Sequence, residues 1–126
     1  MSTISHLTIH DLYSAIREIL LSTPAVVTQT SSAGVASSTV VCNARKGIIS
    51  TSFMTASSGV ALDFVVSNSY VGADDIILVQ PLRYVGTSVP AVSVDSVSSG
   101  FFRVRVTARQ AGAVMNDSMT LGFLVF

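Results

Sequence analysis

The chain has 126 residues, of which only 11% are charged, against about 25% in an ordinary soluble domain. This length predicts a single domain with one core. The formal net charge is zero, and cations cluster only at Arg45-Lys46 and at Arg103/Arg105/Arg109, so we expect no nucleic-acid packaging role. Ser, Thr and Gly take the place of charges, which predicts a surface of Ser, Thr and Val. Such a surface favours self-association, because a hydroxyl costs less to bury than a charge, and a monomer with an unusually neutral surface is the alternative.

One amphipathic helix is predicted from about Ile9 to Ser22. Its apolar residues recur at three- and four-residue spacing, namely Leu12, Ala15, Ile16, Ile19 and Leu20. Thr8 is a suitable N-cap, Asp11 occupies the capping-box position, and Pro24 ends the helix. This helix cannot bury its apolar stripe alone. Either it packs on the rest of its own chain, or the stripe contacts copies of itself or another partner.

The following segment, residues 25–44, is rich in Ser, Thr, Ala and Val and carries no charge before Arg45. Its composition suits either short strands, at Val26–Thr30 and Thr39–Cys42, or an arm that lies along a neighbouring subunit. Polar residues and Pro24 interrupt its hydropathy, so we do not expect a membrane span. We therefore divide the chain into an N-terminal helix and extended arm, residues 1–44, and a β-domain, residues 45–126.

From Arg45 onward the apolar pattern has a period of two, which is typical of half-buried strands. A hairpin turn is expected at Ser98-Ser99-Gly100, after which Phe102, Val104 and Val106 face one side. The other expected strand segments lie at Ile49–Phe53, Val60–Val66, Ile76–Gln80, Val89–Val97 and Met119–Phe126. Short strands at this spacing predict an all-β fold, a β-sandwich or jelly roll.

The last strand is apolar up to Phe126, and its Leu121/Phe123/Val125 set indicates that it is tied into a sheet. Pairing within its own domain and packing at a subunit interface both explain this pattern.

The sequence offers little for catalysis or metal binding. His6 and His10 have helical metal-ligand spacing but no third ligand nearby, and Cys42 has no base beside it in sequence. As the sole cysteine, Cys42 cannot form an internal disulfide, which is consistent with a reducing cytoplasm. Asp74-Asp75 and Asn116-Asp117 lack the spacing of a calcium loop and are explained by turn chemistry. We expect no enzymatic activity, no catalytic or metal site and no cofactor.

Two sets of residues suggest partners. Arg103 and Arg105 lie on one face of a strand, where they either pair with Asp63 or Asp95 across strands or meet an acidic neighbour in an assembly. Aromatic residues beside turns suit either ordinary packing or an interface, and these are Tyr70, Tyr84 and Phe101.

The segment from Lys46 to Phe126 resembles small structural proteins of tailed bacteriophages. The resemblance rests on the stretches Gly47-Ile48-Ile49-Ser50-Thr51, Asp63-Phe64-Val65-Val66-Ser67-Asn68-Ser69-Tyr70-Val71, Ala73-Asp74-Asp75-Ile76-Ile77-Leu78-Val79 and Val94-Asp95-Ser96-Val97-Ser98-Ser99-Gly100-Phe101-Phe102-Arg103-Val104, and on the apolar closing strand. The turn resembles a "TNS-x-V-x-A-D" pattern, with Ser67 in place of the threonine. Such sequences occur in head decoration or cement proteins, head fibres and tail-fibre-like modules.

The resemblance implies a β-sandwich, a homotrimer and assembly on a virion. We expect a decoration or cement protein on the capsid surface, assembled in the host cytoplasm. Its expected partners are sister subunits and the major capsid protein, and we expect it to bind neither nucleic acid nor a membrane. The residues expected at its contacts are Leu12, Ile16, Ile19, Arg103, Arg105, Phe123 and Phe126. The alternatives are a receptor- or glycan-binding module of a fibre, with Tyr70 or Tyr84 at its site, and a small viral coat protein.

Overall fold

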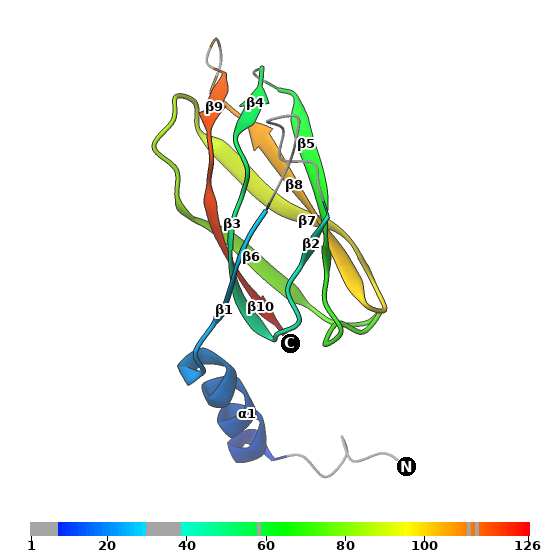
Figure 1. Ribbon diagram of the computed structural model, residues 1–126. Coiled ribbons are helices and arrows are strands. Elements are labelled where there is room, and N and C mark those ends of the chain that lie inside the picture. Colours follow the sequence, from blue (N-terminus) through cyan, green and yellow to red (C-terminus); the bar gives the residue numbers. More distant parts are fainter. Residues whose placement is uncertain (1–7, 30–38, 58, 111, 113) are drawn as a thin grey trace.

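The computed structural model describes residues 8–29, 39–57, 59–110, 112 and 114–126, and within them the chain is mostly strands with one N-terminal helix (Figure 1). The helix is α1, Ile9–Leu21. The strands are β1 Ala25–Thr28, β2 Val40–Val41, β3 Lys46–Ser50, β4 Met54–Ala56, β5 Ala61–Ser67, β6 Ile77–Arg83, β7 Pro90–Ser98, β8 Phe101–Ala108, β9 Met115–Asp117 and β10 Thr120–Val125. The predicted all-β class is confirmed.

The strands form two four-stranded sheets and a small two-stranded one. Sheet A has the order β1-β3-β10-β6, and sheet B has the order β2-β5-β8-β7, while β4 pairs with β9. The last strand, β10, lies in the middle of sheet A, antiparallel to both β3 and β6. The edge strands β1 and β2 are instead parallel to their neighbours β3 and β5.

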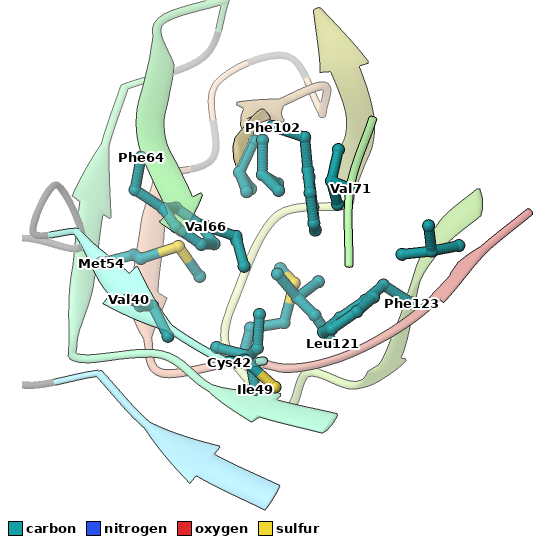
Figure 2. Close-up of a cluster of buried hydrophobic side chains, with 14 of the residues drawn as sticks. Val40, Cys42, Ile49, Met54, Phe64, Val66, Val71, Phe102, Leu121 and Phe123 are labelled. Atoms are coloured by element: carbon teal, nitrogen blue, oxygen red, sulfur yellow. The ribbon is translucent and has the colours of Figure 1, made fainter. Parts of the chain in front are cut away.

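The hydrophobic core combines side chains of both large sheets. Figure 2 shows Phe64 and Val66 of β5 and Phe102 of β8 gathered with Leu121 and Phe123 of β10. The rings of Phe102 and Phe123 meet edge to face with their centroids 5.3 Å apart, a favoured geometry for aromatic pairs. The predicted alternation in β8 is confirmed, because Phe102, Val104 and Val106 are all buried.

Both short strands expected within residues 25–44 are present and pair inside their own chain. Val26 of β1 lies opposite Ile48, and Val40 of β2 lies opposite Val66. Their described residues thus belong to the edges of the two sheets, which favours the strand alternative over an arm along a neighbour. Residues 30–38 of this segment lie outside the described residues.

The two-stranded sheet of β4 and β9 was not expected from the sequence. Its inward residues Met54 and Met115 are fully buried, so this sheet closes one end of the core. The strand expected through Phe53 ends earlier, at Ser50. Beyond that point Thr51 makes two hydrogen bonds to Met119. Its N–H donates to the Met119 carbonyl at 2.8 Å, and its side-chain Oγ1, in place of a backbone carbonyl, accepts from the Met119 N–H at 2.9 Å.

Candidate interaction surfaces

Helix α1 lies beyond the end of the two sheets and forms a projection from them (Figure 1). The predicted capping box is confirmed: Thr8 Oγ1 accepts from the Asp11 N–H at 3.1 Å, and Asp11 Oδ2 accepts from the Thr8 N–H at 3.1 Å. At the other end the backbone becomes extended at Ser22, and Pro24 precedes β1. The helix is therefore stabilised by its own caps and is connected to β1 by three residues, Ser22 to Pro24.

The apolar side chains of α1 are largely uncovered. Ile9 is 88% exposed, Tyr13 62% and Leu21 72%. The helix is joined to the β-domain by a hydrogen bond in which Lys46 Nζ donates to the Leu20 carbonyl at 2.6 Å. A helix of 13 residues gains little stability alone in water. The exposed apolar side chains therefore make α1 the first candidate for an assembly surface.

A cleft of about 700 Å³ separates α1 from the nearest end of the β-domain. Leu12, Ile16 and Ile19 line its helix side, while Tyr70 and Phe126 line the opposite side. Protein interiors are normally packed without voids larger than a water molecule. An open cleft of this size means that α1 does not complete a core with its own β-domain.

The outer face of sheet A is the second candidate surface. Strand side chains alternate between the core and the solvent, yet on this sheet the outward positions are also apolar. Leu78 and Leu82 of β6 are 53% and 51% exposed, and Ile48 and Leu124 are half-buried. We call this set, with Val26 and Gly122, the sheet A outer face.

Gly122 leaves a depression in the sheet A outer face. A Cβ at this position would meet the end of the Leu82 side chain at 3.1 Å, so Leu82 lies over the glycine. A shallow groove of about 550 Å³ runs over the face, and Leu20 at the end of α1 also lines it. Consecutive apolar residues such as Ile48-Ile49 and Phe123-Leu124-Val125 are the sequence signal for a sheet that is apolar on both faces.

The outer face of sheet B is polar and carries an ion-pair network. Arg103 Nε and an Nη donate to the two carboxylate oxygens of Asp95, each at 2.7 Å, and Arg105 donates to the Asp63 carboxylate at 2.8 and 3.0 Å. Arg105 also lies 3.2 Å from Asp95. These residues therefore neutralise one another within the chain, as the cross-strand alternative predicted.

A register irregularity in β7 places Asp95 between the two arginines. Val94 lies opposite Val104 and Ser96 lies opposite Arg103, so Asp95 is the additional residue, a β-bulge in the strand. The sequence carries a signal for this bulge, because the inward valines Val92, Val94 and Val97 are spaced by two and then by three residues.

The arginines hold both carboxyl groups in their ionised form. Hydrogen bonds from the Arg105 side chain lower the pKa of Asp63 below its ordinary value, and those from Arg103 lower the pKa of Asp95. Two bidentate pairs also fix the side-chain geometry on this face. The network explains Arg103 and Arg105 without a partner chain.

The predicted contact residues fall into separate places. Leu12, Ile16, Ile19 and Phe126 come together around the cleft. Phe123, in contrast, is only 3% exposed and packs against Phe102, so it is a core residue of its own chain.

The aromatic residues beside turns differ in their environments. Tyr70 is 52% exposed, and the Arg45 guanidinium lies 5.9 Å from the centre of its ring. Tyr84 is half-buried, and its hydroxyl accepts from the Asn116 N–H at 3.0 Å, so it has a structural role. Phe101 is 39% exposed beside the hairpin turn.

The residues considered for chemistry have structural surroundings. Cys42 is buried in the core, and this burial raises the pKa of its thiol. Asp75 Oδ2 accepts from the Gly72 N–H at 2.8 Å, as expected of a turn residue. His10 is exposed on α1, while His6 lies outside the described residues. In the described part of the chain no three His, Cys, Asp or Glu side chains are grouped as a metal site would require.

Among the described residues, α1 is the only helix, and it is too short and insufficiently apolar to cross a membrane. Comparisons with known protein families, with curated proteins and with solved structures find no match.

Proposed function

We propose that this chain is a structural protein of a virion, a decoration or cement protein built on a β-sandwich that self-associates as a homotrimer and stabilises the head of a tailed bacteriophage. The supporting observation is the projecting helix α1, whose Ile9, Tyr13 and Leu21 side chains are 62–88% exposed. Several large apolar side chains exposed on one projecting helix suit an interaction site, because exposed apolar surface often marks such sites. The low charge content and the resemblance of residues 46–126 to phage structural proteins support the same proposal.

In this mechanism the contacts act mechanically. Sister subunits cover the apolar side chains of α1, and the assembled protein binds the outer surface of the major capsid protein. Many weak contacts in a symmetric array act together, because each additional contact forms at a high effective concentration. No chemical step is required of any side chain.

The test begins with the mass of the protein in solution, measured by light scattering over a range of concentrations. We expect a trimer for the natural chain and dissociation when Ile9 and Leu12 are both changed to glutamine. Glutamine keeps a good helix propensity, so the change removes apolar surface without removing the helix. His10→Gln with Ser14→Gln, on the polar side of the same helix, is the matched control and keeps the mass.

The second measurement is binding of the trimer to capsids that lack decoration, followed by their resistance to heat. Bound protein and a higher disruption temperature support the proposal. A chain that remains monomeric at high concentration and does not bind capsids contradicts it.

A fibre module that binds a receptor glycan is the second candidate, favoured by one observation. Tyr70 is exposed and lies next to Arg45 at the rim of the cleft, and exposed aromatic rings with polar neighbours suit sugar recognition. Binding to defined glycans on an array, lost in Tyr70→Ala and kept in Phe101→Ala, would support this function.

A further inference from the structure

We propose that the sheet A outer face receives helix α1 of a second copy of this chain, so that each subunit gives its helix to one neighbour and accepts a helix from another. This inference rests on the proposed self-association and names the surface that accepts the helix. The first reason is that two apolar surfaces are exposed among the described residues, the Ile9, Leu12 and Tyr13 side chains of α1 and the outer face of sheet A.

Helix α1 is too short for a helix–helix contact to be sufficient. Its 13 residues amount to fewer than two heptads, whereas the pattern that indicates a coiled coil extends over three to four. A sheet, in contrast, offers a broad apolar surface to a short helix, and packing a helix on a sheet is a standard way to bury both. The outer face of sheet B does not offer this surface, because Asp63, Asp95 and the two arginines occupy its centre.

The linker directs α1 away from its own sheet. Ser22 has an extended backbone with a ψ of 153°, and Thr23 precedes Pro24, which disfavours the helical region at Thr23. Folding back over sheet A would require the chain to reverse within these three residues. The geometry therefore favours docking on another copy over docking on the same chain.

The two surfaces have opposite net charge, because α1 carries Asp11 and Glu18 against one cation, Arg17, while sheet A carries cations on its outer face. Asp11 and Glu18 are seven residues apart, which places them on one edge of the helix about 10 Å apart along its axis. The outward positions of sheet A carry Lys46 and Arg83 as their charged residues in the described strands. Lys46 Nζ donates one hydrogen to the Leu20 carbonyl of its own chain, and an ammonium group has two more donors for a carboxylate. From the strand register these two lie about 16 Å apart at Cα, and their long side chains can reach the spacing of the two carboxylates.

A contact of this kind is heterologous, since different surfaces of the two subunits meet. Such contacts close into rings when the rotation between subunits allows it, and three copies closing in this way give the proposed trimer. Each subunit would then take part in two identical contacts, one through α1 and one through sheet A.

The decisive experiment mixes two single-cysteine variants under mild oxidation, Tyr13→Cys on the helix and Leu78→Cys on the sheet A outer face, each with a different tag. Cys42 is 2% exposed and can stay in place. We expect a disulfide-linked heterodimer of Tyr13→Cys with Leu78→Cys, and none when Ser93→Cys, exposed on sheet B, replaces the Leu78 variant.

Light scattering supplies the second readout. Leu78→Gln removes a leucine that the proposed contact would bury, and it should raise the dissociation constant about tenfold or more. Val89→Thr, at a site that is 55% exposed outside sheet A, is the matched control and should leave it unchanged. Circular dichroism establishes that both variants fold.

The possible failures can be told apart. This inference is overturned if Tyr13→Cys forms disulfides only with itself and the Leu78→Gln variant is still a trimer. The proposed self-association would then still hold. A natural chain that is monomeric at every concentration overturns both.

Discussion

Replacing Gly47 by alanine would test how closely sheets A and B are packed. Gly47 is a buried residue of β3, and a Cβ at this position would overlap ring atoms of Phe123 and lie 2.9 Å from the Cys42 Sγ. The Phe123 ring cannot simply move aside, because Phe102 packs edge to face against it. Overpacking of this kind costs about 1–3 kcal/mol. For a domain of this size we therefore expect Tm to fall by roughly 4–12 °C.

The assay is thermal and urea unfolding followed by circular dichroism, with Gly122→Ala as the matched control. Gly122 is a glycine of the neighbouring strand, but its Cβ would point outward to the flexible end of Leu82, so little change is expected. Phe123→Leu should reduce the cost of Gly47→Ala, giving a double mutant more stable than the sum of the single effects predicts. If Gly47→Ala unfolds at the same temperature as the natural chain, the reasoning from core packing is refuted.

Two further predictions concern polar side chains. Asn68→Ala should lower the free energy of unfolding by about 1–3 kcal/mol, because the buried Asn68 Nδ2 donates to the Ala44 carbonyl at 2.6 Å. Asn43→Ala, at an exposed position, should lower it less. Equal urea midpoints for the two variants would contradict this prediction. Arg105→Met should lower stability at pH 7, and this loss should shrink as the pH falls below the unfolded-state pKa of Asp63. The reason is that the lowered pKa of Asp63 contributes stability that is present above the unfolded-state pKa and is lost as pH falls through the folded-state pKa. A stability difference between natural chain and variant that does not shrink in acid would show that the ion pair is not its source.

Local patterns were sufficient to predict much of the fold. The spacing of Leu12, Ile16 and Ile19 and the Thr8/Asp11 capping box predicted α1 to within a residue at its C-terminal end. Alternation predicted β5 and β8, because each has one face in the core and a polar face outward. The hairpin turn at Ser99-Gly100 was predicted because glycine readily takes the positive φ of 90° found there.

Features that depend on distant contacts were not predictable. The pairing of Met54 with Asp117 joins segments far apart in sequence, and three-residue strands give too short a pattern to detect. The sheet A outer face was missed for another reason. Its strands are apolar on both sides, so periodicity could not distinguish Leu78, which faces outward, from Val79, which packs against the core.

The central place of β10 has a consequence for how the chain is made. Ribosomes deliver this strand after β1 to β9, yet it separates β3 from β6 in sheet A. Until β10 emerges, β3 and β6 have no partner between them, and the core side of sheet B lacks Leu121, Phe123 and Val125 as cover. Sheet A therefore closes only after β10 has left the ribosome. Before β10 emerges, the nascent chain exposes apolar strands. A low concentration of nascent chains, or chaperones, must then prevent aggregation with other copies.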